Sequence, residues 1–109
     1  MEVIMPKYLF EITYTESGLQ GVLKEGGYKQ REVIENAIKS LNGWLEVVYF
    51  SFGETDLFVV AELPDNVSAS SFSMIASSAG QARVKTIVLL SPDEIERASK
   101  KTINYHPPG

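Results

Sequence analysis

The chain contains no cysteine, which excludes disulfide bonds, thiolate metal ligands and a cysteine nucleophile. It contains a single histidine, His106, so it has neither the ligands of a histidine zinc site nor the parts of a Ser-His-Asp triad. Phosphate-binding glycine loops are also missing, because Gly26-Gly27 lacks the sequence context that completes one. The sequence therefore indicates no metal and no cofactor.

Positive charge and long apolar runs are scarce as well. The ten lysine and arginine residues are scattered and are outnumbered by fourteen acidic residues, which gives a formal net charge of −4. A nucleic-acid surface needs clustered basic residues, so we expect no nucleic-acid partner. No apolar stretch approaches the roughly 20 residues of a membrane span, and the N-terminus lacks the regions of a secretory signal. We expect a cytoplasmic protein with no membrane partner.

What the chain does contain is a regular order of apolar segments within 109 residues, the length of one domain. The segments have strand spacing in four places and helical spacing between them. We predict strands at residues 7–14, 44–52, 57–63 and 83–90, helices at 28–41 and 67–79, a short helix within 15–24 and a capped helix from Ser91-Pro92. This order is typical of an α+β, ferredoxin-like β-α-β-β-α-β sandwich with a four-stranded antiparallel sheet and an extra C-terminal helix.

The domain bounds follow from the same pattern. We place the ferredoxin-like domain at residues 5–101. An extended C-terminal tail follows at residues 102–109, because Pro107-Pro108 cannot join a helix.

The middle and last strands are apolar on both faces, which is unusual for a sheet with helices on one side only. Alternation places Leu45, Val47 and Tyr49 on one face of their strand, opposite Val48 and Phe50. If the second apolar face stayed in contact with water, the chain would lose several kcal/mol of stabilisation, because burial of apolar surface contributes about 25 cal/mol per Å². We therefore expect a second copy of the chain to cover it, sheet against sheet, in a homodimer or a larger homo-oligomer.

The helix predicted at residues 67–79 carries no charge, and six serines lie between Asn66 and Ala82. Small side chains allow close packing against another element, and simple exposure of the serines is the alternative. Because helices usually carry charge on the wet side, we favour packing.

Several motifs occur in an order that resembles one known family. They are Met5-Pro6-Lys7-Tyr8-Leu9-Phe10, Gly53-x-x-Asp56 before an apolar strand, Leu63-Pro64-Asp65-Asn66, Gly80-x-x-Arg83-Val84-Lys85-Thr86 and Lys100-Lys101-Thr102-x-x-Tyr105-x-Pro107-Pro108-Gly109. Together they resemble the GYD-domain family, from about Met5 to the C-terminus. The resemblance implies a dimeric α+β barrel, in which ferredoxin-like domains pair through their sheets. Relatives on this scaffold include small monooxygenases, isomerases and haem enzymes.

The chain departs from that family at the motif that gives the family its name. Thr55 occupies the tyrosine position in Gly53-Glu54-Thr55-Asp56. A role that needs a phenol there does not carry over to this chain. The resemblance also implies that translation begins at Met5.

Asp56 and Tyr14 are the candidate catalytic residues. Asp56 lies at the start of an apolar strand, where a carboxylate can act as a general base or hold a substrate. Its alternative role is that of a turn residue that accepts hydrogen bonds from backbone amides. Tyr14 carries a hydroxyl that needs a partner if buried, so we expect it to point at a cavity.

An aromatic set with one cation forms the candidate ligand-binding group. Aromatic side chains suit a flat organic ligand, and a basic side chain suits an anionic one. Strand aromatics also build cores, and a strand cation also pairs with glutamates across a sheet. The residues are Tyr8, Tyr49, Phe52, Phe58 and Arg83.

Three hypotheses about function stay open at this point. The first is binding of a small apolar or aromatic molecule in a pocket between the sheet and the helices of a dimeric barrel. The second is a cofactor-independent monooxygenase- or isomerase-like enzyme that uses Asp56 and a tyrosine. The third is an assembly protein whose apolar faces serve only oligomerisation. A filled interface between sheet and helices favours the third, and an open cavity with Tyr14 or Asp56 at its wall favours the first two.

Overall fold

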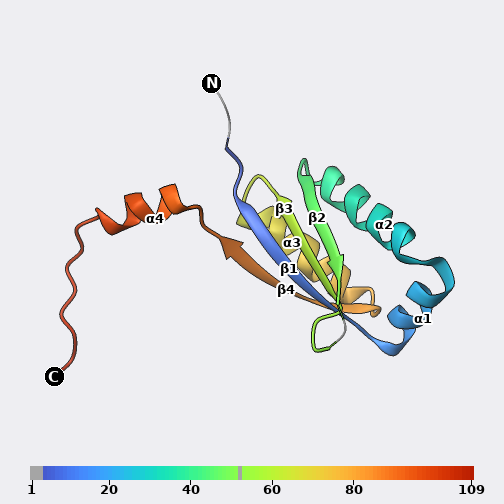
Figure 1. Ribbon diagram of the computed structural model, residues 1–109. Coiled ribbons are helices and arrows are strands. Elements are labelled where there is room, and N and C mark those ends of the chain that lie inside the picture. Colours follow the sequence, from blue (N-terminus) through green and yellow to red (C-terminus); the bar gives the residue numbers. More distant parts are fainter. Residues whose placement is uncertain (1–3, 52) are drawn as a thin grey trace.

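The computed structural model describes residues 4–51 and 53–109. The elements, shown in Figure 1, are β1 (Lys7–Tyr14), α1 (Glu16–Glu25), α2 (Gly27–Ser40), β2 (Trp44–Phe50), β3 (Leu57–Glu62), α3 (Asn66–Ser78), β4 (Ala82–Leu89) and α4 (Pro92–Ser99). Each strand and helix expected from the sequence is present. The predicted end of the second strand at Phe52 lies outside the described residues.

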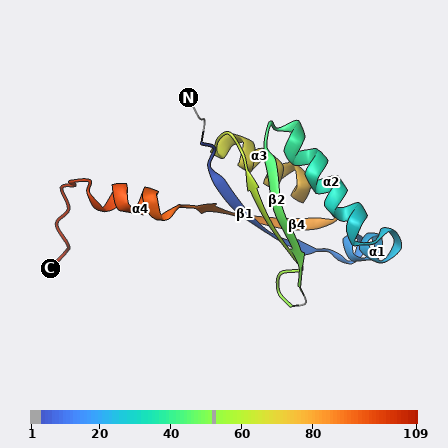
Figure 2. The ribbon, with the colours of Figure 1, turned by 45° about the horizontal axis from the view of Figure 1, so that its top comes forward.

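The four strands form one sheet in the order β2-β3-β1-β4, and all neighbours are antiparallel. Helices α2 and α3 lie on the same side of this sheet (Figure 2). This arrangement confirms the predicted α+β fold of ferredoxin-like type. We call the covered side, toward which Phe10 and Val59 point, the helix face, and the other side, toward which Leu9 and Val60 point, the open face.

The core lies on the helix face, where alternate side chains of β1 and β3 meet the helices. Phe10, Val59 and Ile38 of α2 are fully buried. The ring of Phe10 packs edge-on against that of Phe72 in α3, with ring centroids 4.8 Å apart. Both helices therefore contribute to a single core, as the alternation of apolar residues predicted.

Strand β2 departs from simple alternation. Its register against β3 shifts between Leu45 and Val47, so one extra residue changes the direction of every side chain that follows. Leu45 is buried on the helix face, Val48 packs against the same core, and Val47 and Tyr49 are exposed. The prediction that Leu45, Val47 and Tyr49 share one face was wrong for this reason.

The uncharged helix α3 covers the edge of the sheet. The Ser73 hydroxyl donates to the carbonyl of Val84 at 3.1 Å, and the Val84 amide donates to the Ser77 hydroxyl at 3.1 Å. Because β4 is an edge strand, these bonds use backbone groups that no neighbouring strand pairs. This side of the helix agrees with the expected packing, whereas Ser70 and Ser78 are exposed.

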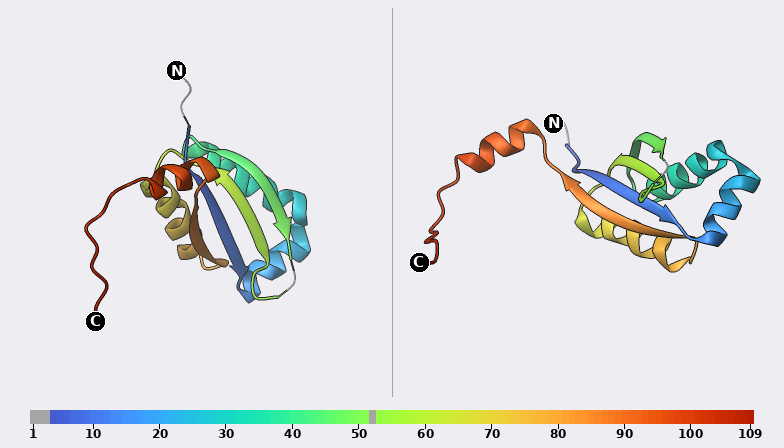
Figure 3. Two further views of the ribbon diagram at one scale, coloured as in Figure 1. Left: turned by 60° about the vertical axis from the view of Figure 1, so that its left-hand side comes forward. Right: turned by 60° about the horizontal axis from the view of Figure 1, so that its bottom comes forward.

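The C-terminal segment extends away from the sheet. Helix α4 is the capped helix predicted from Ser91-Pro92; it begins with a capping box of Ser91 and Glu94, and all of its residues are exposed. Figures 1 and 3 show the helix and tail pointing away from the other elements. The radius of gyration is accordingly 16.7 Å, against about 13 Å for a compact domain of this length. Residues 101–109 form no helix or strand, and the domain boundary at residue 101 stays a prediction.

None of the helices in the described residues is both long and apolar enough to cross a bilayer.

Candidate functional site

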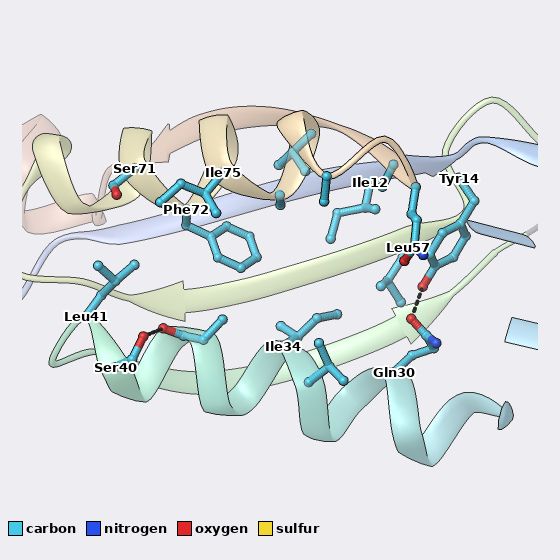
Figure 4. Close-up of a pocket in the computed structure, with 17 residues that line it drawn as sticks. Ile12, Tyr14, Gln30, Ile34, Ser40, Leu41, Leu57, Ser71, Phe72 and Ile75 are labelled. Atoms are coloured by element: carbon cyan, nitrogen blue, oxygen red, sulfur yellow. Dashed lines mark hydrogen bonds between the residues drawn. The ribbon is translucent and has the colours of Figure 1, made fainter. Parts of the chain in front are cut away.

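A groove of about 340 Å³ lies between α2, α3 and the helix face of the sheet. Ile12 and Leu57 belong to its floor, and Ile34 and Phe72 line it from the two helices (Figure 4). The groove exists because the two helices contribute small residues such as Ala76 where a larger side chain would fill the space. Its volume is at the lower end of the range of small-molecule pockets, roughly 300–1,000 Å³.

Polar side chains lie at the ends of this groove. At one end the Tyr14 hydroxyl donates to the Gln30 side-chain oxygen at 3.4 Å, and at the other end lies Ser40 (Figure 4). The Ser40 hydroxyl already donates to the Ala37 carbonyl at 2.6 Å. The Tyr14–Gln30 bond is much longer than the usual hydroxyl hydrogen bond of about 2.7–2.8 Å, so these two groups are only weakly engaged with each other.

The environment of Tyr14 keeps its hydroxyl protonated. Burial, followed by the negative charge of Asp56, raises the pKa of Tyr14 to about 12. Both effects disfavour the phenolate. At neutral pH Tyr14 is therefore a hydrogen-bond donor at the groove, and it is the one titratable side chain among the described residues that line it.

Asp56 acts on Tyr14 through the backbone. A carboxylate oxygen of Asp56 accepts a hydrogen bond from the Tyr14 amide at 2.9 Å. The Asp56 amide donates to the Ile12 carbonyl at 3.0 Å, and the Asp56 carbonyl accepts from the Ser51 amide at 2.8 Å. These three bonds join the start of β3 to β1 and β2, and Asp56 does not line the groove. The geometry fits the turn role that the sequence left open.

Tyr8 belongs to the core and does not line the groove. Its side chain is 1% exposed, and its hydroxyl donates to the Asn66 side-chain oxygen at 2.6 Å. Burial raises the pKa of Tyr8, with a smaller contribution from the Asp65 carboxylate. The hydroxyl is thus satisfied at the start of α3.

Three of the other predicted ligand-binding residues lie on the open face. Tyr49 and Phe58 are cross-strand neighbours there, with Tyr49 exposed and Phe58 half-buried. Arg83 is exposed opposite Thr13, while Phe52 lies outside the described residues. Among the described members of the predicted set, Tyr14 alone lines the groove, so these members do not converge on it.

Sequence reasoning missed Gln30, although the chain carried a signal for it. A stripe along α2 and its C-cap lines the groove with Gln30, Ile34, Ala37 and Leu41, which recur at helical spacing. Gln30 is thus a polar residue on an otherwise apolar stripe, where a side chain needs a hydrogen-bond partner or a ligand.

Metal chemistry has no visible site in the described residues, because they contain no group of three or more His, Asp or Glu side chains placed to hold an ion. His106, the single histidine, is exposed in the tail.

A ferredoxin-like sheet with a groove between its two covering helices defines a small α+β protein with a candidate ligand site at that groove. The GYD domain family matches residues 8–99, and the chain belongs to that family. The family predicted from the sequence motifs is therefore confirmed. No curated protein matches the chain.

Proposed function

We propose that this GYD-family protein binds a small apolar or aromatic molecule in the groove between α2, α3 and the sheet. The groove itself is the observation that carries the proposal, because a filled interface would leave no room for a ligand. Its apolar walls supply the burial, and its few polar groups supply orientation, which is the usual design of a small-molecule site.

The proposal includes a second copy of the chain on the open face, in a cytoplasmic homodimer. A row of apolar side chains runs across all four strands there: Val47 pairs with Val60, Val60 with Leu9, and Leu9 with Ile87. None of the helices in the described residues covers this face (Figure 2). A second sheet is the cover that matches an apolar row of this shape, and burial of the row would stabilise the pair.

The monooxygenase- or isomerase-like alternative has one observation in its favour, the protonated Tyr14 hydroxyl at the groove. Such a group can donate a proton or a hydrogen bond to a substrate oxygen. Asp56 adds less to this alternative, because its carboxylate is bonded to the Tyr14 backbone and lies away from the groove. Binding of a molecule is therefore the function that the geometry supports best.

Native mass spectrometry of gently purified protein tests both parts together. We expect the mass spectrum to show a dimer, either with or without the extra mass of a bound molecule. If no molecule is retained, we expect the dimer to bind the uncharged dye Nile red, and a rise in the dye's fluorescence reports this binding. Ala37→Phe should abolish the uptake because Ala37 lines the groove, and Ala98→Phe on exposed α4 is the matched control. A dimer that binds nothing, with Ala37→Phe and Ala98→Phe indistinguishable, would favour the assembly hypothesis instead.

A further inference from the structure

The groove carries no formal charge. The structure brings 17 residues to its surface, and none of them is Lys, Arg, Asp, Glu or His. Charged residues make up 22% of the whole chain. Their absence from the groove is therefore a property of this site and does not follow from the composition of the chain. An ion placed in the groove would lose its water and find no counter-ion, which is costly.

One end of the groove is nevertheless built to recognise an oxygen atom. The Tyr14 hydroxyl and the Gln30 carboxamide point toward each other from β1 and α2 (Figure 4). Their mutual bond is 3.4 Å long, so a ligand that replaces it sacrifices little. A ligand oxygen that takes the place of the Gln30 oxygen can accept from the tyrosine hydroxyl, and once the carboxamide turns by half a rotation it can also accept from the Gln30 NH2 group.

The charges near this end disfavour an anion. The Asp56 carboxylate accepts from the Tyr14 amide and helps to raise the pKa of its hydroxyl. The strand cations Arg83 and Lys85 point to the opposite side of the sheet, where Lys85 pairs with Glu11 at 3.9 Å. A carboxylate bound beside Tyr14 would thus meet a like charge and no cation.

We propose that the groove selects an uncharged, elongated apolar molecule with one oxygen acceptor, such as a ketone or an ester, and binds this oxygen at the Tyr14–Gln30 end. It discriminates against the carboxylate of the same length. This inference rests on the proposed ligand-binding function. The volume of 340 Å³ lies near the lower end of the range of small-molecule pockets, roughly 300–1,000 Å³, which suits a chain or a ring system of modest size.

Three probes of equal chain length, 2-octanone, octanoate and octane, separate the effects of the oxygen acceptor, the negative charge and the apolar chain on binding. Each is titrated into the full-length protein at about pH 8, where the acid is ionised. Amide NMR shifts locate the binding, and the groove is reported by Ile34, Ala76 and Val84. We expect 2-octanone to bind roughly tenfold more tightly than octanoate, because the anion loses its hydration without gaining a partner.

Variants assign the selectivity to the polar end. Tyr14→Phe should weaken 2-octanone binding roughly fivefold and leave octane unchanged, because one hydrogen bond is lost without loss of apolar wall. Tyr28→Phe is the matched control, since Tyr28 in α2 is 94% exposed and does not line the groove. Folding of both variants is checked by their NMR spectra.

The outcomes distinguish the two proposals. Octanoate that binds as tightly as 2-octanone in the groove would overturn the inferred selectivity and leave ligand binding standing. Equal binding of octane and 2-octanone, with no effect of Tyr14→Phe, would overturn the oxygen-recognition role of this end. If none of the three probes shifts the groove amides, the proposed function itself fails, and the selectivity fails with it.

Discussion

The two faces of the sheet use the same strands for different purposes. On the helix face, alternate residues of β1 and β3 are fully buried within the chain, and apolar packing leaves one uncharged groove. On the open face, the apolar row through Val60 and Leu9 is bordered by ion pairs, Lys7 with Glu46 at 2.7 Å and Lys85 with Glu11 at 3.9 Å. Among the described residues, the helix face has no charged side chain in its buried core. The open face, which we propose meets a second copy, has charged side chains at its border, where they remain solvated.

The largest expected effect comes from placing a charge on each face in turn. Val59→Lys should prevent folding, at a cost above about 4 kcal/mol, because Val59 is 0% exposed and its surroundings offer no counter-ion. Val47→Lys should leave a folded monomer, because Val47 is 39% exposed on the open face. Circular dichroism and native mass spectrometry read out fold and copy number. A Val47→Lys protein that remains a stable dimer would contradict the proposed pairing of open faces.

A smaller effect concerns the way α1 is seated beside the groove. A Cβ atom on Gly18 would lie 1.8 Å from the Gln81 carbonyl oxygen, so Gly18→Ala must displace backbone. We expect a loss of about 3 kcal/mol in the free energy of unfolding. Gly21→Ala on the same helix meets nothing within 4 Å and should be neutral or stabilising by about 0.5–1 kcal/mol. Urea denaturation compares the two, and equal stabilities would show that α1 can shift away from Gln81 without cost.

Removal of the Asp56 carboxylate should have a moderate effect. Asp56→Ala leaves the Tyr14 amide without its acceptor, and we expect a loss of about 1–2 kcal/mol. Asp56→Asn keeps an acceptor oxygen and should lose less. Urea denaturation measures the stability of both variants. If Asp56→Ala leaves stability unchanged but impairs 2-octanone binding, Asp56 acts in ligand binding and does not hold the turn.

The smallest effect is the dependence of stability on alkaline pH. Because the pKa of Tyr14 is raised to about 12 from about 10 in the unfolded chain, its contribution to stability is complete below about pH 10 and is lost as the pH rises toward 12. Tyr14→Phe should therefore lose less stability over this interval than the original chain. Urea denaturation across the interval tests this, and parallel curves for the two proteins would show that Tyr14 is not perturbed by folding.

Most of the fold was accessible from the sequence because its signals are local. Asn42, for example, adopts a positive φ of 62° between α2 and β2, a conformation that asparagine tolerates at the end of a helix. The capping box at Ser91 is similarly local. The shift in register after Leu45 was not accessible, because it depends on how β2 pairs with β3 and not on either strand alone.

The site was harder to predict from the sequence than the fold, because it depends on the partners that each side chain meets in the folded chain. Tyr14 was identified by its hydroxyl and does line the groove. Tyr8 carries the same hydroxyl on the same side of β1, but Asn66 of α3 satisfies it inside the core. The sequence cannot distinguish these two tyrosines, because the difference lies in the partners that the two helices bring to opposite ends of one strand.

The two serine bonds to Val84 also limit how copies of this chain can join. A sheet with two unpaired edges can add strands in both directions and grow into a fibre. Here an incoming strand at β4 would first have to displace Ser73 and Ser77, whereas the other edge belongs to β2. Two chains joined through β2 would both present β4 outward, and at each of these edges the two serine bonds at Val84 would oppose the addition of a further strand.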